Sequence, residues 1–184
     1  MKLMTRGVSG ALAALLVLSL AALASAQESK SASLAKQLAA AMDAGKLDSI
    51  AAKDPSAPDV FVAALYFPGT QLLVVSAKYS APQLLMDRLN KKEFRDVYID
   101  LNSASVPASK IFIEDAAADG LRAKREDNQG YDSYEAGGKR TLFDGDWKKQ
   151  QLTEPDYLKV FSTADDRYAQ MLTLLLAQLK KSTA

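Results

Sequence analysis

The chain has 184 residues, with 23 basic and 22 acidic side chains, no cysteine and no histidine. The lack of histidine and cysteine excludes Ser-His-Asp triads, Cys-His pairs and the usual zinc, copper and haem sites. Its nearly neutral charge argues against a nucleic-acid partner, because binding to phosphate backbones depends on an excess of basic residues. An enzymatic role is not favoured, since only carboxylates, Lys, Tyr, Ser, Thr or a bound cofactor could carry it.

The first 26 residues have the pattern of a secretory signal peptide. Lys2 and Arg6 supply the positive charges, residues 11–23 form an apolar core, and Ala24-Ser25-Ala26 places small residues at a cleavage site. The apolar run is shorter than the roughly 20 residues of a membrane span. We therefore predict cleavage after Ala26 and a periplasmic or secreted protein without a stable membrane span. Removing 26 of the 184 residues leaves 158, enough for one domain with its own core.

The start of the mature chain predicts an arm followed by a helix. Residues 27–33 are small and polar, typical of a flexible arm, and a single domain would occupy residues 34–181. The helix should run to about Ala44, with Gly45 as its C-cap, because apolar residues recur with helical spacing. Those residues are Leu34, Leu38, Ala41 and Met42. The next segment, residues 47–52, fits either a short strand or a helical turn.

Residues 60–77 predict a buried β-hairpin at the centre of the domain. Two runs rich in Val, Leu and aromatic residues, 60–66 and 71–77, have strand length. They flank Phe67-Pro68-Gly69-Thr70, in which Pro and Gly suit the two central positions of a tight turn.

Helices and further strands are expected after the hairpin. Pro82 is suited to the first turn of a helix that runs to about Lys91 or Lys92. Alternation of Val97, Ile99 and Leu101 predicts a strand over residues 95–101. The remaining expected elements are strands over 110–114, near 131–135 and over 140–143, and two C-terminal helices, one beginning near Thr153 and one near Ser162 or Thr163.

Two groups of residues are candidates for ligand or metal binding. Glu114, Asp115 and Asp119 could bind a hard cation, but Asp and Gly are also common in solvated turns, which is the favoured interpretation. Aromatic residues concentrate around the hairpin, among them Tyr66 and Tyr79. They could line a site for a planar ligand or belong to the core of the sheet, which is again favoured.

The order of these elements resembles that of the FMN-binding split-barrel superfamily, the pyridoxamine-phosphate-oxidase-like folds. The resemblance runs from residues 49–52 through the hairpin to residues 110–114, without a matched family motif. It implies that the segment after the second hairpin strand, with Ser76, Lys78 and Ser80, would contact a flavin phosphate. FMN would then be the cofactor.

The predicted fold class is α+β. An antiparallel sheet of about five strands, open or curled into a partial barrel, is covered by an N-terminal helix and two C-terminal helices. The favoured function is an exported, soluble and non-catalytic binding or interaction module, with a small molecule or an envelope protein as its partner. The alternative is a split-barrel flavin-binding protein with oxidoreductase activity. A dimer is compatible with the sequence.

Overall fold

The computed structural model describes residues 29–103, 110–125 and 130–182. The predicted signal peptide and its cleavage site lie outside these residues, as does the first part of the expected arm. None of the helices in the described part of the chain combines the length and apolar character that a membrane crossing requires.

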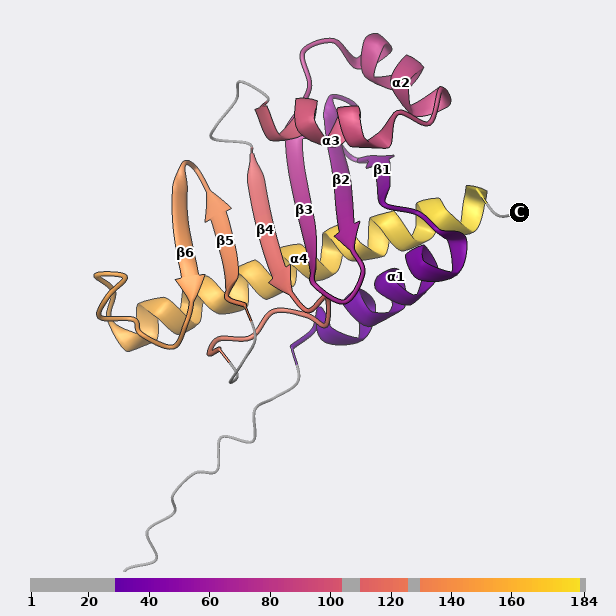
Figure 1. Cartoon of the computed structure of the whole chain (residues 1–184). Helices are drawn as coiled ribbons and strands as arrows, with labels where there is room; N and C mark the ends of the chain where they lie inside the picture. Colours follow the sequence, from indigo (N-terminus) through magenta and orange to yellow (C-terminus); the bar gives the residue numbers. More distant parts are fainter. Residues whose placement is uncertain (1–28, 104–109, 126–129, 183–184) are drawn as a thin grey trace, which may run out of the picture.

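The structure is an α+β fold with one antiparallel sheet and four helices, which confirms the predicted fold class (Figure 1). The strands follow one another across the sheet in chain order, and each pairs with the next. In chain order the elements are α1 (Ala32–Gly45), β1 (Ser49–Lys53), β2 (Val60–Phe67), β3 (Gln71–Lys78), α2 (Pro82–Asn90), α3 (Phe94–Ser103), β4 (Ile111–Ala116), β5 (Asp132–Ala136), β6 (Lys139–Phe143) and α4 (Glu154–Ser182).

Strands β2 and β3 form the predicted central hairpin. Their register pairs Val60 with Lys78 at one end and Phe67 with Gln71 at the other. Gly69 in the connecting turn has a φ of 67°, a value that glycine adopts without steric cost. The hairpin therefore forms as the Pro-Gly signal indicated, and the sheet extends from it on both sides to six strands, where about five were expected.

The two faces of the sheet carry separate cores, because successive side chains of a strand point to opposite faces. Helices α1 and α4 pack together on one face, here called the α4 face, over Val62, Val74 and Ile113. Helix α3 covers strands β1, β2 and β3 on the other face, here called the α3 face, over Phe61 and Val75. Helix α2 packs on α3 and lies beyond the sheet (Figure 1).

The predicted strand over residues 95–101 is wrong, because this segment is helix α3. Its buried residues are Val97, Tyr98 and Leu101, which share one side of a helix. Ile99, which the alternating pattern would bury with Val97 and Leu101, is 54% exposed. Val97 and Leu101 fit both the two-residue spacing of a strand and the four-residue spacing of a helix. Tyr98 is buried with them, which fits a helix and not a strand.

The two predicted C-terminal helices are one continuous helix, α4, of 29 residues. Ser162 and Thr163, expected to begin the second helix, lie within it, and the Thr163 hydroxyl donates a hydrogen bond of 2.9 Å to the Lys159 carbonyl. Such bonds satisfy a hydroxyl inside a helix without ending it.

The segment expected to be a flexible arm is docked on the domain from residue 30 onward. The backbone amides of Lys30 and Ser31 donate hydrogen bonds of 2.7 and 3.0 Å to the Asp165 carboxylate of α4. Ser31 is fully buried, and its hydroxyl accepts a hydrogen bond of 3.0 Å from the Leu121 amide.

Candidate functional site

The end of helix α1 is closed by two backbone hydrogen bonds that reverse the chain direction. The Lys46 amide donates to the Asp43 carbonyl at 3.2 Å, and the Leu47 amide donates to the Met42 carbonyl at 2.9 Å. Lys46 adopts the left-handed conformation that this Schellman arrangement requires, with φ of 51°. The reversal brings the Leu47 side chain back towards Met42 and directs the chain into β1. It thereby builds one wall of a pocket.

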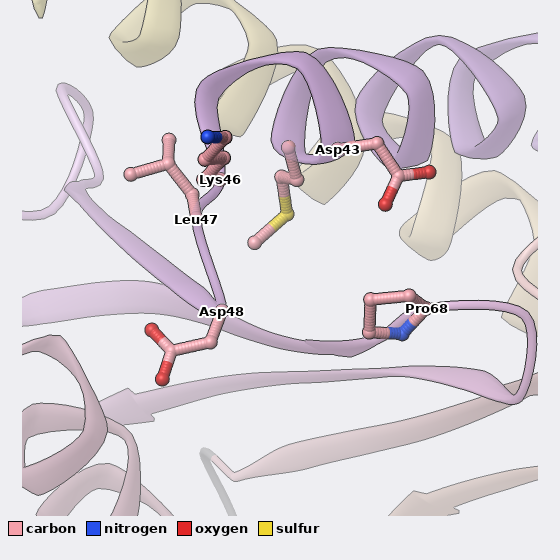
Figure 2. Close-up of a pocket in the computed structure, with 6 residues that line it drawn as sticks. Asp43, Lys46, Leu47, Asp48 and Pro68 are labelled. Atoms are coloured by element: carbon pink, nitrogen blue, oxygen red, sulfur yellow. The ribbon is translucent and has the colours of Figure 1, made fainter.

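A pocket of about 310 Å³ lies between the end of α1, the start of β1 and the β2–β3 turn (Figure 2). The carboxylates of Asp43 and Asp48 lie on opposite sides of it. Pro68, from the hairpin turn, stands on the Asp43 side. The full lining is Met42, Asp43, Lys46, Leu47, Asp48 and Pro68.

The Asp43 carboxylate is held in place by Tyr66 of strand β2. The Tyr66 hydroxyl donates a hydrogen bond of 2.9 Å to Asp43 Oδ2. Burial and the neighbouring Asp43 raise the pKa of Tyr66, so the hydroxyl remains a donor. Asp48 Oδ1 accepts a hydrogen bond of 3.1 Å from the Ser49 hydroxyl. Among residues 29–103, 110–125 and 130–182, each carboxylate therefore keeps an oxygen without a recorded hydrogen bond.

The electrostatics of the pocket favour a cation. Two carboxylates stand at the C-terminal end of α1, where the last carbonyls of a helix carry partial negative charge. Lys46 adds a basic residue to the lining, and Asp43, Lys46 and Asp48 are all exposed, so solvent screens the three charges alike and two negative charges stand against one positive charge. Apolar groups of Met42, Leu47 and Pro68 provide the remaining contact surface.

The predicted ligand-binding residues are not brought together in one site. Tyr66 lies beside the pocket through its bond to Asp43, whereas Ser76 lies at the other end of the hairpin on the same face. Lys78 forms an ion pair with Asp59 at 3.4 Å, and the Tyr79 hydroxyl donates to Asp100 at 3.2 Å. Ser80 is exposed between β3 and α2.

The three acidic candidates also diverge. Glu114 pairs with Arg140 on the α3 face, and Asp119 pairs with Arg122. Asp115 is fully buried on the α4 face, where it accepts a hydrogen bond of 2.8 Å from the Tyr168 hydroxyl and one of 2.9 Å from the Gly120 amide. Within the described ranges, no group of three or more Asp and Glu residues is placed to hold a metal ion.

Asp43, Asp48 and Pro68 were not predicted as site residues. Met42 was assigned to the core stripe of its helix, which is correct, since it is fully buried. Asp43 and Asp48 flank a helix end within six residues of sequence. This spacing is the signal from which the two carboxylates could have been predicted to lie near one another. Nothing local to the sequence shows that Pro68 would join them.

Searches against models of protein families, curated proteins and solved structures found no match to this chain. The resemblance to the flavin-binding split-barrel superfamily therefore stays a prediction, which a flavin absorbance spectrum of the purified protein would test.

Proposed function

We propose that this chain is an exported, non-catalytic binding module whose site at the end of α1 takes a small ligand bearing a protonated amine. The observation that carries the proposal is the pocket of about 310 Å³ at the negative end of a helix, with two carboxylates on its opposite sides. Its size is at the lower end of small-molecule sites, which begin at about 300 Å³.

Asp43 is the main recognition group in this proposal. Tyr66 fixes its orientation through Oδ2, and Oδ1 is left to accept a hydrogen bond from an ammonium group. A hydrogen bond to a charged partner contributes about 1.5–3 kcal/mol. Asp48, on the opposite side, adds a second attractive charge, and the apolar groups between them contact the carbon skeleton of the ligand.

The export part of the proposal rests on the N-terminal sequence pattern.

The test is a titration of the mature protein with n-pentylammonium, monitored by NMR of ¹³C-labelled methionine methyl groups. After cleavage the methionines are Met42, Met86 and Met171. We expect the Met42 signal to shift selectively. Asp43→Asn should weaken binding by roughly 10-fold or more, through loss of the charge-assisted hydrogen bond.

The control is Asp96→Asn, which removes an exposed carboxylate from α3 and should leave the affinity unchanged. Equal affinity of the Asp43→Asn and Asp96→Asn variants, or a Met42 signal that does not move, would refute the proposed function.

A further inference from the structure

A second cavity, of about 100 Å³, lies on the α4 face of the sheet and shares no residue with the pocket at the end of α1. It is found where β1 and β3 end and where β2 and β4 begin, at the opposite end of the hairpin from Pro68. One side is formed by α4. Its lining residues are Asp54, Val62, Ser76, Ile111, Arg167, Gln170, Met171 and Leu174.

The floor of this cavity is a row of three residues on neighbouring strands. Ser76 of β3 is directly opposite Val62 of β2 and Ile111 of β4 in the sheet register. A hydroxyl group thus stands between two apolar side chains. The structure records no hydrogen bond for the Ser76 hydroxyl among the described residues, so it can serve a bound molecule as donor or acceptor.

The walls carry two opposite charges without a mutual ion pair. Arg167 donates one side-chain hydrogen bond, from Nη1 to Gln170 Oε1 at 3.3 Å, and no ion pair is found for it in the described part of the chain. Most of its guanidinium donors are therefore available to a carboxylate.

Asp54 presents the complementary charge. Its Oδ1 accepts hydrogen bonds from the Ser56 amide at 2.8 Å and the Ser56 hydroxyl at 2.6 Å. These bonds lower the pKa of Asp54 and keep it ionised, while fixing its orientation. In the described part of the chain no hydrogen bond to its Oδ2 is recorded, so this oxygen can accept one from an ammonium group.

We propose that this cavity is a separate binding site for a small zwitterion, the ammonium and carboxylate of a free α-amino acid. Arg167 binds the carboxylate, Asp54 binds the ammonium, and the Ser76 hydroxyl contacts either group from the floor. A volume of about 100 Å³ restricts the occupant to amino acids with the smallest side chains. This site is independent of the proposed amine pocket.

The experiment titrates the mature protein with L-alanine, acetate and ethylammonium, with the Met171 methyl signal as the reporter, because Met171 lines this cavity. We expect L-alanine to shift Met171 and to bind at least 10-fold more tightly than acetate or ethylammonium, each of which engages one charge. Arg167→Gln and Asp54→Asn should each weaken L-alanine binding at least 10-fold. Both changes retain polar side chains at positions that are not fully buried, so the fold should persist.

A control variant separates this site from the rest of the molecule. Arg95→Gln removes an exposed cation from α3 and should bind L-alanine like the wild type. Acetate or ethylammonium that shifts the Met171 signal with the same affinity as L-alanine would overturn the zwitterion proposal, as would an unchanged affinity at Met171 in the Arg167→Gln variant. Failure of the amine pocket would instead appear at Met42, so the two results are distinguishable.

Discussion

Lys46 holds a left-handed backbone conformation, with φ of 51°, at the end of α1. This conformation costs an L-residue with a Cβ atom about 1 kcal/mol, whereas glycine adopts it freely. We expect Lys46→Gly to raise the free energy of unfolding by roughly 0.5–1 kcal/mol in urea denaturation, after allowance for the greater freedom of glycine in the unfolded chain.

Lys46→Ala is the matched control for this prediction. Alanine also loses the lysine charge but keeps the Cβ atom, so it should give no such gain. If the glycine and alanine variants unfold at the same urea concentration, the left-handed conformation of residue 46 is not a source of strain.

The sequence located this helix end to within one residue but assigned the wrong role to Gly45. Glycine is the usual residue at the left-handed position, so Gly45 was expected there. In the structure Gly45 is the last helical residue, and a Cβ added to it would lie 3.3 Å from the Leu47 side chain. Gly45 is therefore required for its small size, which makes room for the returning chain. Sequence rules for helix ends cannot tell this requirement from a need for the left-handed conformation.

Residue patterns identified the core better than they identified sites. Met42 and Leu38 were expected on the buried stripe of α1 and are fully buried. The proposed sites instead combine residues distant in sequence, as with Asp54 and Arg167. Their proximity depends on the way α4 crosses the sheet, and no local spacing rule contains that information.

At the scale of elements, α4 packs with α1 over one face of the sheet. Leu172 is fully buried against the sheet, whereas Leu158 on the same helix is 49% exposed. We expect Leu172→Ala to lower the free energy of unfolding by about 2–5 kcal/mol, through lost burial and the cavity left behind. Leu158→Ala has the same chemistry and helix propensity and should cost less than about 1 kcal/mol.

Urea denaturation of the two variants tests this prediction. Comparable losses for both would mean that position 158 is buried in solution, and therefore that α4 contacts a further surface there.

Elements whose apolar residues follow one clear spacing, that of a strand or that of a helix, were predictable. Elements whose apolar residues fit both spacings were not. The β2–β3 hairpin was correct because its strands are bounded by a Pro-Gly turn. Helix α3 was mistaken for a strand because Val97 and Leu101 fit both spacings. The unbroken course of α4 was missed because Ser162 and Thr163 resemble helix caps, although tertiary packing carries the helix past them.

At the scale of the whole molecule, a buried polar network joins the N-terminal segment, the sheet and α4. Asp115 of β4 binds Tyr168 of α4, and Asp132 of β5 accepts hydrogen bonds from the Ala116 amide at 2.8 Å and the Arg122 amide at 2.7 Å. Gly120, in the turn between these strands, lies so close to α1 that an added Cβ would be 2.3 Å from the Ala32 Cα. The antiparallel pairing of β2 with β3 could be predicted from the short turn that joins them, but this network could not, because its members are far apart in sequence.

The network makes the stability of the protein depend on pH in a defined window. Burial is the main cause that raises the pKa of Asp115 to about 7, and burial together with the Asp115 charge raises the pKa of Asp132 to about 7. In the unfolded chain both groups titrate near 3.9. Between these values the folded state retains protons that the unfolded state has lost, so the free energy of unfolding falls as the pH rises and levels off above about 7.

We expect the free energy of unfolding, measured with urea, to fall by at least about 1 kcal/mol from pH 5 to pH 8, because one pKa unit corresponds to 1.36 kcal/mol. The chain has no histidine, so apart from the N-terminal amine no group with an ordinary pKa titrates in this window. Asp132→Asn should flatten the dependence, whatever its effect on stability at a single pH, and the exposed Asp96→Asn should preserve it. A free energy of unfolding that stays constant or rises from pH 5 to pH 8 would show that Asp115 and Asp132 are both ionised in the folded protein, with their hydrogen-bond donors outweighing the cost of burial.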